Sequence, residues 1–330
     1  MPDILLLIVV VLSLAFDYIN GFHDTANAIA TSVSTRALTP RVAVWLAAGL
    51  NFLGAMYSTG VAKTIGSDIV RSANLVNEQT IIAAMIGAIC WNLITWWLGI
   101  PSSSSHALVG GVIGAVLVST GVEALKVDGI IKIVMALVFS PLIAIVLGVI
   151  IMTAIFWMVG RKAPSSINNK FRRLQILSAA MMSFAHGSND AQKAMGIITL
   201  TLVSAGYLTT FEVPLWVKIV AASAMGAGTA AGGWRIIRTM GGKIFKLEPV
   251  SGFAADLNSS CVIFGATLFH LPVSTTHVVS GSIMGVGTAK RLNAVRWGVA
   301  QQMLAAWVLT IPSTALVSAL AYKFISLLVK

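Results

Sequence analysis

The chain is poor in charge, and its charge is unevenly shared between the two signs. Only 10% of its 330 residues are Asp, Glu, Lys or Arg, where a soluble domain averages roughly 25%. Eleven acidic residues stand against 22 basic ones, for a formal net charge of +11. Hydrophobic residues make up 57% of the chain and the mean hydropathy is +0.89. These proportions exclude an ordinary soluble domain and predict an integral membrane protein.

Cysteine is also scarce. Cys90 and Cys261 are the two cysteines, and both stand in apolar segments, so we expect them to be buried free thiols. This count excludes a disulfide framework and a CxxC metal site. The first residues carry no basic region ahead of the apolar run, so a cleaved signal peptide is not expected.

Long apolar runs predict the fold class. A spanning helix needs ~20 mostly apolar residues, and each half of the chain supplies three such spans and one hairpin. The predicted segments are spans at 4–34, 40–62 and 130–160 with a hairpin at 80–120, then spans at 175–206, 214–233 and 294–322 with a hairpin at 250–290. We predict an all-α integral membrane protein with discontinuous helices and re-entrant hairpins.

Basic residues gather in four places, which the positive-inside rule assigns to the cytoplasm. They are Arg36 with Arg41, the segment 161–173, the segment 235–246 and the segment 290–296. Three spans per half is an odd number, so the second half must lie upside down relative to the first. We therefore predict an inverted-topology repeat of two homologous halves. Its parts are a first repeat at 1–160, a cytoplasmic linker at 161–173 and a second repeat at 174–330, with both termini outside.

One short phrase occurs in both halves and contains a carboxylate. Gly21-Phe-His-Asp-Thr-Ala-Asn and Ala185-His-Gly-Ser-Asn-Asp-Ala-Gln-Lys align Asp24 with Asp190. A carboxylate at bilayer depth costs at least ~2.5 kcal/mol. The small residues beside each Asp permit an unwound stretch, in which carboxylate and carbonyl oxygens can hold a cation. A plain hydrogen bond to a neighbouring helix is the alternative, and the matched duplication argues against it.

A second duplicated phrase is rich in hydroxyls. Pro101-Ser-Ser-Ser-Ser-His106 recurs as Pro272-Val-Ser-Thr-Thr-His277. Proline suits the first turn of a helix, and hydroxyls beside free N–H groups at a helix N-terminus make an anion site. Capping alone would explain one hydroxyl per helix. The candidate anion ligands are Ser103, Ser104, Ser105, Ser274, Thr275 and Thr276, and the two histidines are interpreted as structural donors.

At these residues the chain resembles the inorganic phosphate transporter (PiT) family, whose hallmark is a duplicated G-x-N-D-x-A-N-A signature with a P-x-S-[ST]-[ST]-H motif. The resemblance runs from Phe16 to about Arg291 and is strongest to the bacterial low-affinity branch. It implies a homodimer in the cell membrane that takes up phosphate together with a cation. It also implies that Asp24, Asn27, Asn189 and Asp190 bind cation and substrate, and that the hydroxyl motifs hold phosphate.

The chain departs from the sodium-coupled pattern at two positions. His23 stands where that pattern has Asn, and Lys193 stands where it has the second Asn. A Lys ammonium beside Asp190 could take the place of sodium, and His23 can titrate near neutral pH. We therefore predict proton coupling through Asp24, Asp190, His23 and Lys193, with a neutral metal–phosphate complex admitted as substrate.

Other functions stay open at this point. If sodium is the coupling ion, Asp24 and Asp190 are its predicted ligands. A related permease for sulfate or another oxyanion is the second alternative. An enzyme is not expected, because the reactive-looking residues are duplicated, which suits alternating access better than one-way chemistry. No cofactor and no nucleic-acid partner is predicted, and membrane lipid is the expected surrounding.

Overall fold

The structure, a computed structural model, describes residues 2–160 and 164–328. Helices dominate throughout, joined by short turns, and in chain order they are α1 (Pro2–Ser34), α2 (Pro40–Ala55), α3 (Gly60–Ser67), α4 (Glu78–Leu98), α5 (Ser104–Ser119), α6 (Val127–Val159), α7 (Pro164–Asp190), α8 (Gln192–Ser204), α9 (Leu215–Ala231), α10 (Trp234–Arg238), α11 (Pro249–Leu268), α12 (Thr275–Lys290) and α13 (Trp297–Leu328). Short turns of helix lie between them, η1 (Ala73–Leu75), η2 (Val122–Ala124), η3 (Thr239–Lys243) and η4 (Leu292–Ala294).

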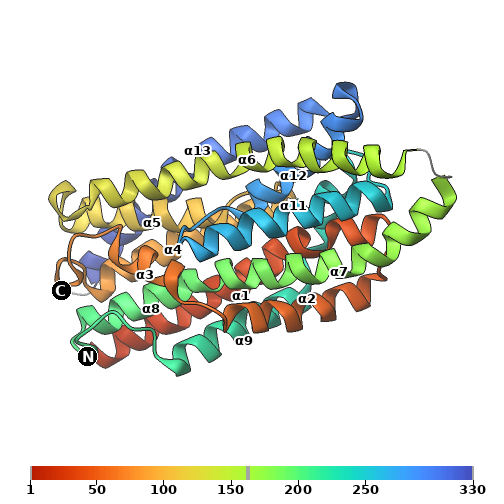
Figure 1. Ribbon diagram of the computed structural model, residues 1–330. Helices are drawn as coiled ribbons and strands as arrows, with labels where there is room; N and C mark the ends of the chain where they lie inside the picture. Colours follow the sequence, from red (N-terminus) through yellow and green to blue (C-terminus); the bar gives the residue numbers. More distant parts are fainter. Residues whose placement is uncertain (1, 161–163, 329–330) are drawn as a thin grey trace.

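The helices form an elongated bundle with both ends of the chain at the same end (Figure 1). Helices α1, α6 and α13 run nearly the full length of this bundle, and α7 continues into α8 in the same way. The pairs α4–α5 and α11–α12 are hairpins whose turns, at 101–103 and 272–274, are buried inside the protein. Buried turns of this kind fit re-entrant hairpins.

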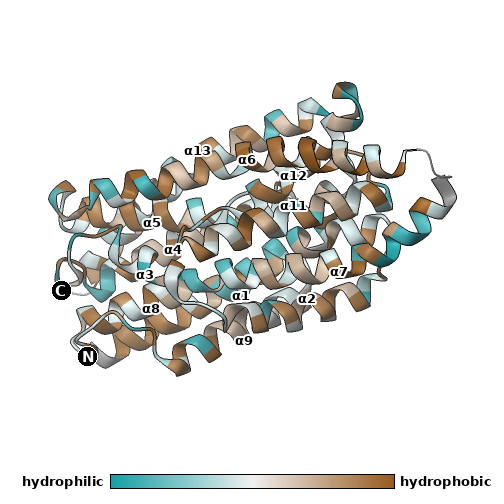
Figure 2. Cartoon of the chain, in the orientation of Figure 1, coloured by the Kyte–Doolittle hydropathy of each residue, from teal (hydrophilic) through white to brown (hydrophobic). Residues whose placement is uncertain are grey.

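Length and composition identify the membrane segments. Among the described residues, α1, α4, α6 and α13 are long and apolar enough to cross a membrane. Two bent pairs add one span each if the pair is counted as one, α2 with α3 at 69° and α9 with α10 and η3 at 59°. Figure 2 shows hydrophobic residues along most of each helix and hydrophilic ones gathered at the start of α7. The chain is therefore a multi-pass membrane protein with broken helices.

Two expectations fail in detail, those of an unwound stretch and of buried thiols. The unwound stretch expected at Asp24 is absent, because α1 is one helix from Pro2 to Ser34, and the second phrase is interrupted only at Ala191. The predicted linker is helical from Pro164 onward, while residues 161–163 lie outside the described part. The thiols are not buried, since Cys90 is partly exposed and Cys261 is exposed, as suits an apolar side chain facing lipid.

Both hairpins turn by the same local devices. The Ser103 hydroxyl accepts the His106 backbone N–H at the start of α5, and the Ser274 hydroxyl accepts that of His277 at the start of α12. Just after the preceding helix, one residue adopts the left-handed conformation, Gly99 at φ 68° and His270 at φ 59°. Such a conformation is strained for a non-glycine residue. The two hairpins therefore keep one backbone shape even where the residue type differs.

Close helix contacts bring the two duplicated phrases into the centre. A Cβ added at Gly21 of α1 would lie 2.5 Å from the Met225 carbonyl oxygen of α9, and one at Gly187 of α7 would lie 2.1 Å from that of Asn51 of α2. Only a glycine allows backbones to approach so closely. Either substitution to alanine would push apart the helix pair that holds the site.

Candidate functional site

The two duplicated phrases meet in the interior of the bundle. Asp24 lies near the middle of α1, Asp190 is the last residue of α7, and Lys193 lies in the first turn of α8. Asp24 is 1% exposed, and Asp190 and Lys193 are fully buried. Buried charges of this kind are stable only when they are paired and hydrogen-bonded, so the contacts around each Asp define the site.

Asp24 is held by a ring nitrogen and two hydroxyls. His23 Nδ1 lies 2.6 Å from Asp24 Oδ1. The Ser104 hydroxyl donates to Oδ2 and the Thr276 hydroxyl donates to Oδ1, each at 3.2 Å. The other ring nitrogen of His23 lies 3.2 Å from the Thr95 hydroxyl of α4. The carboxylate of the first half is thus satisfied by a histidine and by hydroxyls from both hairpins.

Asp190 is held instead by a cation. Lys193 Nζ lies 3.0 Å from Asp190 Oδ1 as a close ion pair, and it also donates to the Ser104 hydroxyl at 2.9 Å. The Thr275 hydroxyl donates to Asp190 Oδ2 at 3.0 Å. The prediction that Lys193 lies within reach of Asp190 is confirmed geometrically, and its ammonium joins a carboxylate to a hydroxyl of the other half.

The six hydroxyls predicted to hold an anion separate into three groups. Ser103 and Ser274 cap α5 and α12. Ser105 donates to the Val273 carbonyl at 2.8 Å and so ties one hairpin turn to the other. Ser104, Thr275 and Thr276 contact the two carboxylates. Capping therefore accounts for one hydroxyl per helix, and three hydroxyls remain for binding.

The two predicted asparagines occupy different surroundings. Asn27 Nδ2 donates to Thr276 at 2.9 Å and to Thr275 at 3.3 Å, inside the site. Asn189 Nδ2 donates to the Thr267 hydroxyl and to the Leu271 carbonyl, at 3.0 and 3.2 Å. Asn189 therefore bonds to the end of α11 and the turn after it, whereas Asn27 reaches the carboxylate-bound hydroxyls.

His186 also belongs to the site and lies one helix turn before Asp190. Asn51 donates through Nδ2 to Thr229, which directs its Oδ1 to His186 Nδ1 at 3.1 Å. Nδ1 then carries the proton, and Nε2 faces Asp190 Oδ2 at 3.5 Å. Two acceptors that face each other repel unless a proton or a cation lies between them. The spacing of four residues between His186 and Asp190 was the available signal.

A metal could be held at the same place. Asp24, His186 and Asp190 each offer one ligand atom, and these atoms lie within 4.8 Å of one another. In the described part of the chain this is the one group of three or more His, Cys, Asp or Glu side chains with that geometry. The Lys193 ammonium already neutralises Asp190, so it would compete with a metal ion.

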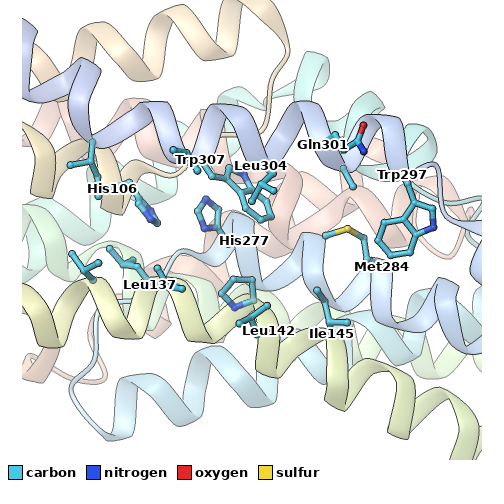
Figure 3. Close-up of a pocket in the computed structure, with 16 residues that line it drawn as sticks. His106, Leu137, Leu142, Ile145, His277, Met284, Trp297, Gln301, Leu304 and Trp307 are labelled. Carbon is cyan, nitrogen blue, oxygen red and sulfur yellow. The ribbon is translucent and has the colours of Figure 1, made fainter.

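The two histidines of the hydroxyl phrases line a cavity. His106 and His277 have ring centroids 4.6 Å apart, and Trp307 of α13 stacks on His277 at 3.8 Å. Figure 3 shows both imidazole rings between α13 and α6, where they line a mostly apolar cavity of about 550 Å³. His106 Nδ1 also lies 2.7 Å from the Ser103 hydroxyl. A role as structural donor fits the His106 ring, whereas Nε2 of His277 has no hydrogen-bond partner among the described residues.

Together these contacts form relays in which every site hydroxyl accepts from a nitrogen and donates to a carboxylate. Lys193 donates to Ser104, which donates to Asp24, and Asn27 donates to Thr275, which donates to Asp190. A hydroxyl that lies between a donor and a carboxylate can turn to an incoming anion when that carboxylate takes up a cation or a proton. The site can therefore bind an anion and a cation together.

Comparisons with known proteins agree with this geometry. The model of the phosphate transporter family matches residues 20–318. A probable low-affinity inorganic phosphate transporter of Bacillus subtilis is 54% identical over 327 residues, which is 98% of each chain. One of Rhizobium meliloti is 48% identical over 320 residues, 96% of each chain.

A solved structure has the same fold. It is described as the sodium-dependent phosphate transporter and superimposes with a TM-score of 0.88, at 27% sequence identity, over 98% of this chain and 99% of its own. The relatives are transporters and not enzymes. With a family model that covers most of its length and a relative identical at more than half of the aligned positions, the chain belongs to the phosphate transporter family.

Proposed function

We propose that this protein carries inorganic phosphate across the cell membrane in symport with protons, by alternating access. The observation that carries the proposal is the position of the Lys193 ammonium, 3.0 Å from Asp190 and 2.9 Å from the Ser104 hydroxyl. A fixed positive charge at this point occupies the space that a mobile cation would need beside Asp190. The same ammonium also places a positive charge beside the hydroxyls that would bind an anion.

Phosphate would bind where α5 and α12 begin. The N-terminal ends of both helices carry partial positive charge, and Ser104, Thr275 and Thr276 point from their first turns to the carboxylates. Protonation of Asp24 would remove one negative charge and release two hydroxyls to the anion. His23, whose Nδ1 lies 2.6 Å from Asp24, would hold or pass that proton.

Alternating access would rest on the inverted repeat. Each half packs its helices on helices of the other half. Helix α5 packs on α13 and α12 packs on α6, and in the same way α1 packs on α9 and α7 packs on α2. A proline lies inside each of the continuous helices α6 and α13, at Pro141 and Pro312. These paired contacts support two halves that swap conformations about a fixed central site.

The coupling ion has a specific alternative. The related solved structure is described as sodium-dependent, and in that case Asp24 and Asp190 would be sodium ligands, with His186 within reach of both. The divalent ion of a metal–phosphate complex would use the same three side chains. No contact among the described residues of the site favours a permease for sulfate or another oxyanion.

One experiment tests the function and the coupling ion together. Radiolabelled phosphate and sulfate uptake would be measured in proteoliposomes under separately imposed proton and sodium gradients. We expect phosphate uptake driven by the proton gradient without sodium. Uptake that requires sodium would reject proton coupling, and preferred uptake of sulfate would reject the substrate. The homodimer implied by the family resemblance is tested by the mass of the purified protein–detergent complex.

A further inference from the structure

A second group of buried polar side chains lies beside the Asp24–Asp190 centre. It consists of Asp17 and Asn20 on α1 and Asn92 on α4, each fully buried. None of their side-chain oxygen or nitrogen atoms has a hydrogen-bond partner among the described residues. Buried polar groups are rarely left unpaired, because the loss of water is then uncompensated. Three neighbouring residues in this condition call for a ligand.

The relative position of α1 and α4 follows from two contacts. Ser13 Oγ lies 3.6 Å from Met85 Sδ, and His23 Nε2 lies 3.2 Å from Thr95 Oγ1. In both contacts the α4 residue comes 72 positions after the α1 residue. The two helices are therefore parallel and in constant register over this stretch.

Asn20 and Asn92 are separated by the same 72 positions and lie between those contacts, so they are at one level of the α1–α4 interface. They do not hydrogen-bond to each other. Asp17 is three residues before Asn20 and shares its face of α1. The register thus brings two carboxamides and one carboxylate together without direct bonds between them.

The chemistry of this group suits a small cation of single charge. A carboxylate and two carboxamide oxygens are hard ligands, and one carboxylate balances one positive charge. Lys193 and Asp190 of the central site pair with each other at 3.0 Å, so together they add no net charge. We propose that Asp17, Asn20 and Asn92 form a separate binding site for a monovalent cation, sodium or hydronium.

The proposed site lies on the same helix as Asp24, toward the start of α1. Seven residues of α1 separate Asp17 from Asp24, which is about 10 Å along the helix axis. One turn beyond Asn20, His23 contacts both Thr95 of α4 and Asp24. A cation held here would stand between the end of the bundle that carries the termini and the central carboxylates. This placement extends the proposed cation-driven transport, while binding of the cation itself needs no phosphate.

The test measures cation binding to the purified full chain in detergent without phosphate, so that it can fail independently of transport. One arm measures equilibrium binding of radioactive sodium in alkaline buffer. The other follows proton uptake in sodium-free choline buffer when the pH is lowered. Binding in the first arm identifies sodium as the ligand. Because every titratable side chain takes up protons, the second arm identifies hydronium only if Asn92→Leu, which removes no titratable group, lowers the proton uptake.

Two variants and one control test whether the cation binds at Asp17, Asn20 and Asn92. We expect Asn92→Leu and Asp17→Asn to weaken the response at least about 10-fold, because each removes a ligand of a charged group. Ser13→Ala, a change at the same α1–α4 interface, should bind like the unmodified protein. Asn92→Ser replaces the leucine variant if that protein does not fold, as judged by thermal melting.

The proposal is overturned by either of two results. The unmodified protein could respond in neither arm, or it could respond through the centre alone. In the second case the response would disappear in Asp24→Asn and persist unchanged in Asn92→Leu and Asp17→Asn.

Discussion

One face of α1 and the matching face of α7 and α8 stand at corresponding positions of the two halves, yet their chemistry differs. The residues in order are Asp17, Asn20, Asp24 and Asn27 in the first half, and Ser183, His186, Asp190 and Lys193 in the second. The first face carries two carboxylates and no cation, whereas the second carries one carboxylate with its own ammonium. The matched faces thus hold one carboxylate pair without a fixed cation and one carboxylate that an ammonium already neutralises.

This difference explains the contacts of the hydroxyls. Asn27 and Lys193 occupy matched positions, and each donates to a hydroxyl of the opposite half, Thr275 and Ser104 respectively. The neutral amide of Asn27 and the ammonium of Lys193 make matching hydrogen bonds, but only the ammonium adds a positive charge to its half-site. The two matched positions therefore make the same kind of contact, while only one of them carries a positive charge.

The largest effect should come from breaking the buried ion pair. Asp190→Asn would leave the Lys193 ammonium without a counter-charge and should cost about 3–5 kcal/mol of stability, with loss of phosphate uptake. Asp24→Asn strands no cation, so it should abolish uptake at a smaller cost in thermal stability. Melting temperatures of both variants in detergent provide the measurement. Equal destabilisation would mean that the two half-sites do not differ in this way.

Next in size is the exchange of the coupling ion. His23→Asn combined with Lys193→Asn makes the second half-site resemble the first and frees Asp190 to recruit a mobile cation. We expect loss of proton-driven phosphate uptake in proteoliposomes and a gain of uptake driven by sodium. If the double variant retains full proton-driven transport, neither residue carries the coupling. The proton must then use Asp24, Asp190 or the phosphate itself.

A moderate effect should separate the binding hydroxyls from the capping ones. Ser104→Ala and Thr275→Ala should weaken apparent phosphate affinity by about 0.5–1.5 kcal/mol, or about twice that to a charged partner. Ser103→Ala and Ser274→Ala remove caps and should lower stability by about 1 kcal/mol with little change in affinity. The half-saturating phosphate concentration of each variant, measured with expression as control, distinguishes a binding hydroxyl from a capping one. The binding role is rejected if both members of the first pair transport with unchanged affinity.

The smallest effect on activity is expected from a topology test. Single cysteines at the exposed positions Asn74 and Asn169 should leave phosphate uptake unchanged, once Cys90 and Cys261 have been replaced by alanine. The inverted arrangement predicts that a membrane-impermeant thiol reagent labels position 74 from outside and position 169 from inside. Labelling of both positions from one side contradicts the predicted topology and with it the inverted repeat.

Much of the local structure around the site followed from residue type and spacing. Pro101 and Pro272 with the hydroxyls after them predicted two helix starts, and α5 and α12 begin at Ser104 and Thr275. The different hydrogen-bond partners of those hydroxyls could not be predicted in the same way. Whether Ser105 or Ser104 turns to the carboxylate depends on the rotation of α5 about its axis, which is set by packing on α13 and α4.

The continuity of α1 shows the same limit. Glycine beside a buried Asp permits an unwound stretch, but Gly21 serves a close contact with α9 and leaves the helix intact. The family resemblance implied that Asn189 binds cation or substrate beside Asp190, yet consecutive residues of a helix point in directions about 100° apart. Asn189 therefore bonds to the α11–α12 turn, and His186, one turn before Asp190, faces the carboxylate.

The sequence by itself determined the membrane environment of the protein, its family and the chemical groups of the site. Hydropathy, charge placement and duplicated phrases are properties of the chain. The tertiary structure alone decided which of those groups meet. It brought Lys193 to Ser104 across 89 positions and Thr276 to Asp24 across 252, and it left the buried side chains of Asp17, Asn20 and Asn92 without hydrogen-bond partners among the described residues. Helix register and close glycine contacts set these distances, and both depend on packing between segments far apart in the chain.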